Sequence, residues 1–437
     1  MIYGLLIAIF VLGYAAIVFE HNLKIDKAAA ALVTGVLCWT VYIIGGADIH
    51  HAEHLLLEHV SEIAGILFFL LGAMTIVELV DAHEGFSVIT SRLKTKNPVV
   101  LLWSVALLTF FLSAVLDNLT TSIVMISLLR KLVKEQNMRW TFAGIVVIAA
   151  NAGGAWSPIG DVTTTMLWIG QQITAGEIIH GVFFTAIVSM LIPVTLLSFT
   201  LKGTLERPEA TGELNNQYVT DGERKLVLVA GVGGLLFVPV FKTVTHLPPF
   251  MGMMFSLGVL WLITDLIHRK KAEEHRQHLG VIHTLRKIDT PSVLFFLGIL
   301  LAVAALQAGG QLTDLAKLLD AQIGTSSQNG VYLVGGIIGV LSAIIDNVPL
   351  VAAAMGMYPI ELDAVSYFAT DGLFWEYLAY TAGTGGSILI IGSAAGVAVM
   401  GLEKIPFGWY LKRISGLALI GYLGGIGAYM LQQQLGF

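Results

Sequence analysis

Long apolar runs alternate with short polar segments along the whole chain. Because about 20 apolar residues cross the hydrocarbon core of a membrane, this pattern predicts about ten membrane-spanning helices. The expected spans cover residues 2–20, 27–46, 63–82, 140–170, 179–201, 225–241, 249–268, 291–307, 373–400 and 408–431. Two further apolar stretches, about 99–133 and 331–358, are each too long for one helix and too short for two complete spans. We therefore expect an all-α, polytopic membrane protein with two additional segments that enter the membrane only in part.

The charges that flank these two stretches indicate how each one meets the membrane. Lysine and arginine concentrate in the short cytoplasmic loops of membrane proteins. Basic residues lie on both sides of the first stretch, within Arg92–Lys96 and within Arg130–Arg139. The second stretch is followed by acidic residues and no basic residue over 359–376. Both stretches are therefore predicted to be re-entrant hairpins, the first entering from the cytoplasmic side and the second from outside.

Short sequence matches recur in the same order in the two halves of the chain. Phe68-Phe69-Leu70 resembles Phe295-Phe296-Leu297, and Gly153-Gly154 resembles Gly385-Gly386. Loop charges start one half outside and the other inside, so the halves form an inverted-topology repeat, as in many secondary transporters. The predicted division is a first repeat at 1–201 with a hairpin at about 99–133 and a broken helix at about 140–170, a cytoplasmic linker at 202–224, and a second repeat at 225–437 with a hairpin at about 331–358 and a broken helix at about 373–400.

Composition supports the same class of protein. Of the 437 residues, 56% are hydrophobic and 12% are charged, whereas a soluble domain carries about 25% charged residues. The net charge of −6 does not favour a nucleic-acid partner. Cys38 is the single cysteine, so no disulfide can form within the chain. The composition therefore predicts that most of the chain is surrounded by membrane lipid.

Two copies of the pattern Ser-x-x-x-Asp-Asn place charge inside otherwise apolar stretches. One copy is Ser113–Asn118 and the other is Ser342–Asn347. A carboxylate at membrane depth is costly and usually functional, because no water is there to solvate it. Residues Asn151–Asp161 (NAGGAWSPIGD) and Tyr380–Gly392 (YTAGTGGSILIIG) interrupt two spans with glycines, the first also with a proline. Such breaks free backbone groups that can line a cavity and coordinate ions.

The polar side chains of these four segments all offer oxygen ligands. The first half contributes Asp117, Asn118, Asn151, Asp161, Thr163 and Thr164, and the second contributes Ser342, Asp346, Asn347, Thr381, Thr384 and Ser387. Oxygen ligands suit hard cations, and the lack of cysteine and histidine in these segments argues against zinc or copper. Burial disfavours the charged form of a carboxylate, so the same group can also hold a proton. Competition between a proton and a cation for one carboxylate is sufficient for exchange.

Other classes of function receive less support. No lysine or arginine lies in either broken region, which argues against an organic anion as the main substrate. No histidine lies near either cluster to activate a nucleophile, so we expect neither an enzyme nor a cofactor. Asp117 and Asp346 have a structural alternative as helix caps. An external histidine cluster lacks the standard zinc spacing and is predicted to be a solvated amphipathic segment. It consists of His50, His51, His54 and His59.

The string Asn151–Trp168 (NAGGAWSPIGDVTTTMLW), together with Asp117-Asn118 in a hairpin, resembles the NhaD-type sodium/proton antiporters of the ion transporter superfamily. The segments SAIIDNVP and YTAGTGGS extend the resemblance over essentially the whole chain. The resemblance implies efflux of Na+ or Li+ in exchange for H+ across the bacterial inner membrane, by a homodimer whose hairpin tips meet the broken helices. It implies Na+ binding at Asp117, Asn118, Asn151, Asp161, Thr163, Thr164, Ser342, Asp346, Asn347, Thr381 and Thr384.

Members of the same superfamily remain as alternatives. Sodium-coupled dicarboxylate symporters share the fold but carry Ser-Asn-Thr at the hairpin tips, where this chain has Asp-Asn. The additional negative charge at each tip disfavours a dianion. Metalloid efflux permeases also carry Asp-Asn in their hairpins, but the string WSPIGDVTTT favours the antiporter. An ion channel fits less well, because inverted broken-helix repeats suit alternating access.

Overall fold

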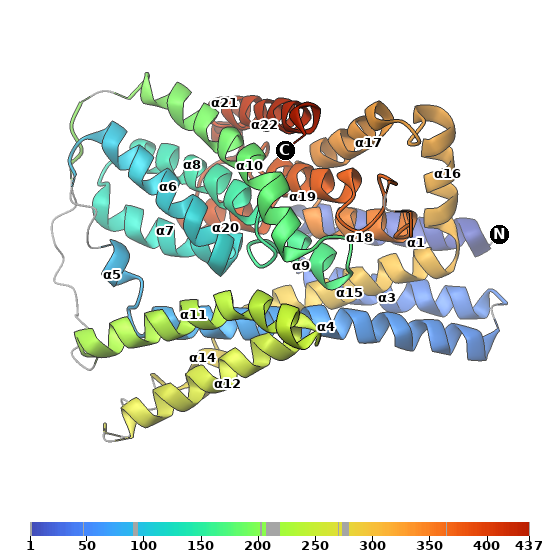
Figure 1. Cartoon of the computed structure of the whole chain (residues 1–437), viewed down its shortest axis with the longest axis horizontal. Coiled ribbons are helices and arrows are strands. Elements are labelled where there is room, and N and C mark those ends of the chain that lie inside the picture. The colour runs from blue at the N-terminus through green and yellow to red at the C-terminus, as the bar shows by residue number, and fades with distance from the viewer. Residues whose placement is uncertain are drawn as a thin grey trace.

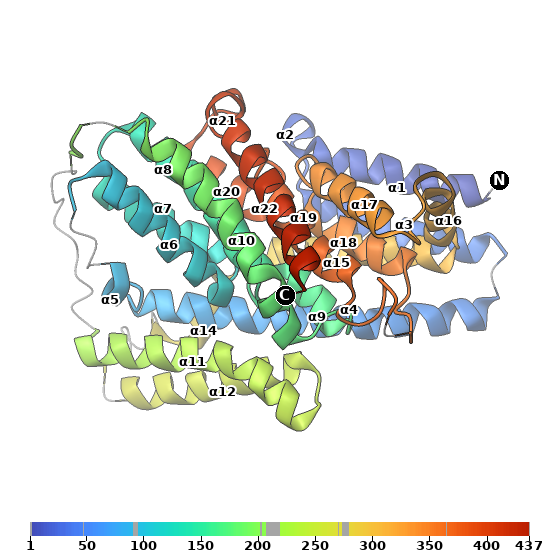
Figure 2. The ribbon, with the colours of Figure 1, turned by 45° about the horizontal axis from the view of Figure 1, so that its top comes forward.

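The computed structural model describes residues 2–46, 48–90, 95–201, 203–206, 219–269, 271–272, 279–363 and 365–436. Over these ranges the regular structure is helical, apart from one isolated bridge between Glu361 and Ala369. The predicted all-α architecture is confirmed. Figure 1 shows that α4 extends along most of the long axis of the molecule, and Figure 2 shows α11 and α12 on one side of it.

Each half of the chain contributes a series of helices in the same order. In the first half they are α1 (Ile2–Val18), α2 (Glu20–Leu23), α3 (Lys27–Ile44), α4 (Ile49–Ala82), α5 (Ser87–Thr90), α6 (Pro98–Leu116), α7 (Asn118–Leu132), α8 (Gln136–Ala155), α9 (Val162–Ile169) and α10 (Ala175–Ser198). In the second half they are α11 (Asp221–Thr245), α12 (Pro249–His268), α14 (Val281–Leu285), α15 (Thr290–Ala308), α16 (Gln311–Ile323), α17 (Gln328–Leu341), α18 (Asn347–Met357), α19 (Leu373–Gly385), α20 (Ala394–Glu403), α21 (Phe407–Arg413) and α22 (Ser415–Leu435).

Seven of the described helices are long and apolar enough to cross a membrane alone, namely α3, α4, α6, α10, α11, α12 and α15. The pair α21 and α22, bent by 52°, would make an eighth span. The chain is therefore a multi-pass membrane protein. The predicted spans 140–170 and 373–400 are both interrupted, the first into α8 and α9 and the second into α19 and α20. We call these two helix pairs broken helix 1 and broken helix 2.

The predicted span 408–431 is bent between α21 and α22, and two further helices also differ from the sequence prediction. Helix α4 begins at Ile49 rather than at residue 63, because Asp48 caps it by accepting the N–H of His51 at 2.9 Å and no proline follows to interrupt it. The external histidine cluster is thus the first part of a 34-residue helix. Helix α16 was not anticipated from the apolar pattern. It is short and amphipathic, with Leu312 and Ala316 buried and Asp314 exposed, and therefore contains no apolar run.

Helices α6 and α7 form the first predicted hairpin, which we call hairpin 1. The N–H of Leu205 donates to the carbonyl oxygen of Lys96 before α6 at 2.9 Å. The N–H of Lys134, after α7, donates to the carbonyl oxygen of Glu206 at 3.0 Å. The two ends of hairpin 1 therefore meet the same short segment, as a re-entrant hairpin requires. That this face is cytoplasmic stays a prediction from loop charge.

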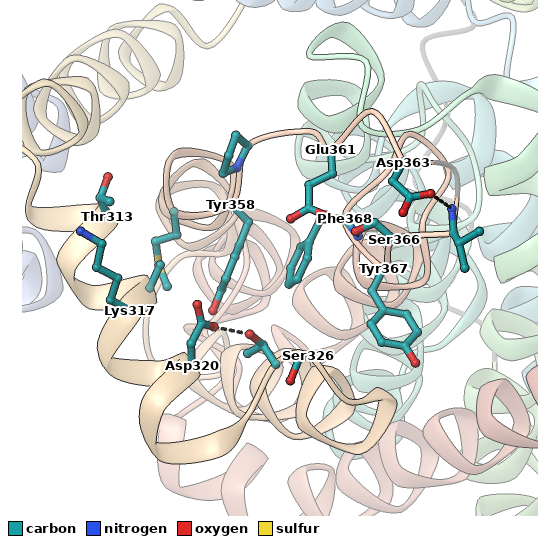
Figure 3. A pocket seen from close by; sticks show the side chains of 15 residues that line it. Thr313, Lys317, Asp320, Ser326, Tyr358, Glu361, Asp363, Ser366, Tyr367 and Phe368 are labelled. Atoms are coloured by element: carbon teal, nitrogen blue, oxygen red, sulfur yellow. Dashed lines mark hydrogen bonds between the residues drawn. The ribbon is translucent and has the colours of Figure 1, made fainter.

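Helices α17 and α18 form the second predicted hairpin, hairpin 2. A cavity of about 730 Å³ lies between α16 and the segment that follows α18 (Figure 3). Thr325 and Ser326, just before α17, line this cavity together with Met357 and Tyr358 at the end of α18. The start and end of hairpin 2 thus lie close together, as a re-entrant hairpin requires. That both hairpins re-enter the membrane stays a prediction.

Helices α3 and α15 pack closely and run in the same direction. A Cβ added at Gly35 would lie 2.6 Å from the carbonyl oxygen of Gly298, so glycine is needed for this approach. Further along both helices, the indole N–H of Trp39 donates to the carbonyl oxygen of Leu301 at 3.0 Å. Helices α4 and α12 form the corresponding contact on the other side of the molecule.

Helices α10 and α22 are the last helices of the first and second halves. They pack against each other and run in opposite directions. A Cβ added at Gly421 would lie 2.3 Å from the carbonyl oxygen of Ser189, and the amide of Gln432 donates to the carbonyl oxygen of His180 at 3.4 Å. Equivalent helices are thus antiparallel, as an inverted repeat requires. The division into 1–201, 202–224 and 225–437 stays a prediction, and most of the linker lies outside the described residues.

Candidate functional site

The tip of hairpin 1 is a single residue, Asp117, between α6 and α7. Its backbone adopts φ 73° and ψ 159°, a region used almost only by glycine and costing about 1–3 kcal/mol for other residues. Its two carboxylate oxygens accept the N–H and the hydroxyl of Thr120, both at 2.8 Å. The carboxylate is therefore held in place by neutral donors at a strained position.

The tip of hairpin 2 is longer and relaxed. Residues 342–346 separate α17 from α18. The last of them, Asp346, caps α18 with φ −50° by accepting the N–H of Val348 at 3.1 Å. The other carboxylate oxygen of Asp346 lies 3.9 Å from the ammonium nitrogen of Lys27, the first residue of α3. Lys27 was missed because it precedes an apolar run that predicts only a span. A cation at the start of that run was the available signal.

Broken helix 1 places a third carboxylate between the two tips. Its first half ends at Ala155 and its second begins at Val162, and Asp161 caps the second half by accepting the N–H of Thr163 at 3.3 Å. Asp161 is 2% exposed. Its Oδ2 accepts the side-chain N–H of Asn347 at 3.3 Å, which joins broken helix 1 to the tip of hairpin 2. The charges of Asp117 and Asp346 both act on Asp161.

A fully buried amide, Asn151, connects hairpin 1 to both broken helices. Its carbonyl oxygen accepts the side-chain N–H of Asn118 at 3.1 Å. Its amide nitrogen donates to the hydroxyls of Ser387 and Ser393, each at 2.9 Å. The Asn pair predicted for the first half is thus brought together. Ser393, which caps α20, was missed because nothing in its sequence context distinguishes it from other serines.

The serine of each tip pattern anchors its hairpin to the broken helix of the same half. Ser113 donates to the carbonyl oxygen of Ala150 at 2.6 Å, and Ser342 donates to that of Ala382 at 2.7 Å. These matching contacts show that the sequence repeat produces a structural repeat. Ser342 therefore holds the tip in place through its proton and keeps its lone pairs.

The candidate threonines lie within the broken helices. Thr164 donates to the carbonyl oxygen of Gly154 at 3.2 Å. Thr381 and Thr384 donate to the carbonyl oxygens of Leu378 and Tyr380 at 3.4 and 2.6 Å. Each of these hydroxyls donates its hydrogen bond to a backbone carbonyl, so the hydroxyl oxygen remains available as an acceptor.

Among the described residues, no group of three or more His, Cys, Asp or Glu side chains lies close enough together to hold a metal ion. The carboxylates of Asp117, Asp161 and Asp346 therefore do not converge on one point. The external histidines also form no such group within the described chain, and His54 and His59 instead lie 3.9 and 3.5 Å from carboxylates of the same helix. Joint binding of Na+ by the eleven predicted residues stays a prediction.

Comparison with characterised proteins adds to this geometry. The chain is 49% identical to sodium/proton antiporter 1 of Arabidopsis thaliana over 98% of this chain and 72% of the relative. It is 47% identical to sodium/proton antiporter 2 of the same plant over 97% of this chain and 98% of the relative. It is 30% identical to the Na(+)/H(+) antiporter NhaD of Alkalimonas amylolytica over 97% and 89%. The chain belongs to the NhaD-type sodium/proton antiporters.

Two further comparisons set this NhaD-type chain in a wider context. Residues 14–385 match the model of the CitMHS family, described as citrate transporter, so the chain is also a member of that wider family. The crystal structure of the Alcanivorax borkumensis YdaH transporter, said to have an unusual topology, matches with a TM-score of 0.59 at 12% identity. The match covers 94% of this chain and 99% of that chain, and it shows a shared fold.

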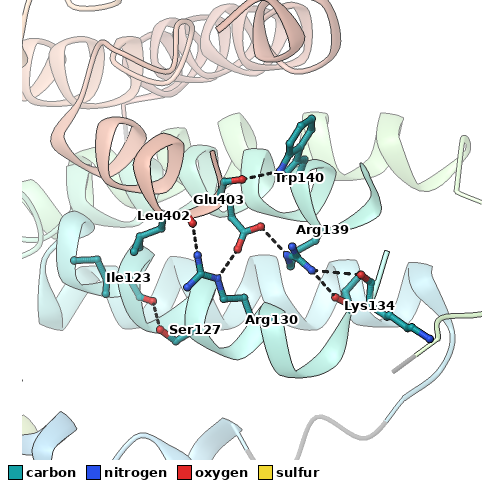
Figure 4. A network of polar contacts seen from close by, with 9 residues as sticks. Ile123, Ser127, Arg130, Lys134, Arg139, Trp140, Leu402 and Glu403 are labelled. Carbon is teal, nitrogen blue, oxygen red and sulfur yellow. Dashed lines mark hydrogen bonds and ion pairs between the residues drawn. The ribbon is translucent and has the colours of Figure 1, made fainter. Parts of the chain in front are cut away.

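A buried carboxylate away from the tips joins the end of α7 and the start of α8 to broken helix 2 in this NhaD-type fold (Figure 4). Glu403 is the last residue of α20, and its side chain is 1% exposed. Its carboxylate accepts hydrogen bonds from the Nε–H of Arg130 at 2.7 Å and from the Nε–H of Arg139 at 2.6 Å. The indole N–H of Trp140 donates to the carbonyl oxygen of Glu403 at 3.0 Å. Hairpin 1 and α8 are thereby tied to broken helix 2.

Proposed function

We propose that this protein moves Na+ out of the cytoplasm in exchange for H+, and that Asp161 is the group for which the two ions compete. One observation carries the proposal. Asp161 is 2% exposed, and its described hydrogen-bond partners, the N–H of Thr163 and the amide of Asn347, are neutral. A buried carboxylate with neutral partners needs a positive charge close by to be stable. A proton and Na+ each supply that charge, and they exclude each other from the same oxygens.

The remaining candidate residues have two roles in this proposal. Asp117 offers a second carboxylate, held by Thr120, whose charge favours a cation near Asp161. Neutral oxygens complete the shell around the ion, as in other sites built from broken helices. They come from Asn118, Asn151, Thr163 and Thr164 in the first half and from Ser342, Asn347, Thr381 and Thr384 in the second.

A citrate-like anion, suggested by the name of the wider family, is not favoured by the described residues. Anions are held by lysine, by arginine or by helix N-termini. The lysine beside a hairpin tip, Lys27, faces the carboxylate of Asp346, and carboxylates cap the helices that begin at Asn118, Val162 and Asn347. The charges of Asp117 and Asp161 would repel an anion from the other tip. The sodium-coupled dicarboxylate symporter and the metalloid permease therefore remain the less supported alternatives.

Further features of the proposal come from the sequence resemblance alone. They are Li+ as a second transported ion, a homodimer in the lipid bilayer, a bacterial inner membrane as the location, and the absence of a cofactor. The similarity to plant antiporters supports exchange as the activity and does not decide between membranes.

The test uses purified protein reconstituted in vesicles with an acidic interior and a pH-sensitive dye. We expect external Na+ or Li+ to release protons, and K+, citrate or succinate to cause no release. The same vesicles without protein give the leak rate. Uptake of labelled citrate or succinate, without proton release on addition of Na+, would contradict the proposal and support the symporter.

A further inference from the structure

The two hairpin tips repeat one sequence pattern, but a fixed positive charge faces one of them. The ammonium nitrogen of Lys27 lies 3.9 Å from Oδ2 of Asp346. It also lies 4.6 Å from the centre of the Phe295 ring, on the neighbouring helix α15. The side chains of Lys27 and Asp346 are 25% and 17% exposed, so the pair is largely removed from solvent.

Within the described part of the chain, no ion pair comparable to Lys27–Asp346 is found at Asp117 or Asp161. Among the described residues, neither Asp117 nor Asp161 takes part in an ion pair, and their hydrogen-bond partners are backbone N–H groups, the hydroxyl of Thr120 and the amide of Asn347. The symmetry of the repeat would otherwise place equivalent cation positions at the two tips. Lys27 adds a difference in charge between them.

The position of Lys27 within its own helix is unfavourable. It is the first residue of α3, where the partial positive charge of the helix N-terminus disfavours a cation. Asp26 caps the helix by accepting the N–H of Ala28 at 2.8 Å, which offsets this cost in part. A lysine at this position therefore does not serve the stability of α3, and its contacts with Asp346 and Phe295 are the interactions that account for it.

We propose that Lys27 is a built-in cation that occupies the second of two equivalent cation positions, so that Na+ binds beside Asp117 and Asp161 and not beside Asp346. A lysine carries a compact positive charge. A Na+ on Asp346 would lie within a few ångströms of it, and at such distances the repulsion weakens binding by roughly 100-fold or more. The proposal rests on the proposed function, because it defines how many Na+ ions the transport site holds.

The test counts Na+ ions bound by the purified full chain, with ²²Na+ as the probe, and measures the Hill coefficient of Na+-driven proton release. We expect one Na+ and a Hill coefficient near one for the wild type and for Lys27→Arg, which keeps the charge. We expect two Na+ and a Hill coefficient above one for Lys27→Met, which exposes the carboxylate of Asp346 to a second ion.

A double variant keeps the test decisive if Lys27→Met does not fold. Removing one partner of a partly buried ion pair leaves an uncompensated charge, whereas removing both does not. The variant Lys27→Met/Asp346→Asn should therefore fold and bind one Na+. If Lys27→Met and the double variant both fail to fold, then Lys27 acts through Phe295 and the proposal is wrong.

Other outcomes separate this proposal from the proposed function. Two Na+ ions bound by the wild type would show that Na+ displaces Lys27, and one Na+ bound by a folded Lys27→Met would show that Lys27 excludes nothing. Either result overturns the inference and leaves Na+/H+ exchange intact. A wild type that neither binds Na+ nor releases protons on its addition overturns both.

Discussion

The tips of the two hairpins have the same sequence pattern and different chemistry. Asp117 is a one-residue tip with a strained backbone and neutral partners, whereas Asp346 ends a relaxed turn and faces Lys27. The serines of both patterns make matching contacts with the broken helices. The repeat therefore reproduces the position of each tip, and residues outside the repeated pattern decide what each tip can bind.

The largest effect should come from the carboxylate between the tips. Asp161→Asn keeps an oxygen that can accept the N–H of Thr163 but removes the charge for which Na+ and H+ compete. We expect Na+-dependent proton release to fall to the rate of vesicles without protein, while the protein remains folded. Asp265→Asn, at an exposed position of α12, is the matched control and should retain full activity. Full activity of Asp161→Asn would remove this residue from the site.

A glycine substitution at each hairpin tip would show whether the backbone is strained at Asp117 and relaxed at Asp346. Asp117→Gly relieves a strain of about 1–3 kcal/mol and loses a helix cap of about 1 kcal/mol, so the stability should be unchanged or increased while transport is lost. Asp346→Gly relieves no strain, loses its cap and leaves Lys27 uncompensated, so it should lower the stability by about 1–3 kcal/mol. Thermal unfolding in detergent measures both. A lower stability for Asp117→Gly than for Asp346→Gly would contradict the comparison.

The contacts that join α7 and α8 to broken helix 2 should have an effect on stability no larger than that of Asp346→Gly. The side chain of Arg139 is 20% exposed and that of Arg130 is 48% exposed, and both bind Glu403. Arg139→Met should lower the stability by about 1–3 kcal/mol, because Arg130 still holds the carboxylate, and Arg130→Met by about 1 kcal/mol or less. Arg286→Met, at an exposed position, serves as the control in the same unfolding experiment. The ranking requires that Arg139→Met lower the stability more than Arg130→Met, and that Arg130→Met stay close to the control Arg286→Met. A loss of stability for Arg130→Met as large as that for Arg139→Met would contradict it.

A region away from both tips should show the smallest effect, a dependence of stability on pH. Nε2 of His83, which follows α4, lies 2.7 Å from Nε2 of His268, so one ring donates and the other accepts. Burial lowers the pKa of His83, and the hydrogen bond to the carbonyl oxygen of Leu79 offsets this only in part. Below about pH 6.5 the unfolded chain binds a proton that the folded chain does not, so stability should fall as the pH falls.

The unfolding temperature of the wild type should therefore decrease between about pH 6.5 and pH 5, the range below the usual pKa of histidine. His83→Gln removes the titrating group and should show a weaker decrease over the same range. An identical pH dependence in the two proteins would exclude a contribution from this histidine pair.

Sequence patterns predicted the spans, both hairpins and both breaks because each leaves a local signal. An apolar run, a pair of basic flanks or a Gly-Gly-x-x-x-Pro string can be recognised without knowledge of packing. The same holds for Asp117, Asp161 and Asp346, since a carboxylate inside an apolar run is conspicuous. These residues lie where the prediction placed them, at the tips and at a break.

The residues that were missed owe their roles to distant parts of the chain. Lys27 meets Asp346 from another helix, Ser393 meets Asn151 across the two halves, and Glu403 meets two arginines of the first half. None of these pairings leaves a periodic or compositional trace. Long-range contacts between single polar residues follow from helix packing, which one sequence does not reveal.

The arginine pair around Glu403 also has a consequence for the synthesis of the protein. Arg130 and Arg139 precede Glu403 by 273 and 264 positions, so hairpin 1 leaves the ribosome long before its carboxylate partner exists. Until Glu403 has been synthesised, the nascent chain lies in the bilayer with Arg130 and Arg139 not yet paired to this carboxylate. A nascent chain truncated before α20 would therefore lack the carboxylate that joins α7 and α8 to broken helix 2.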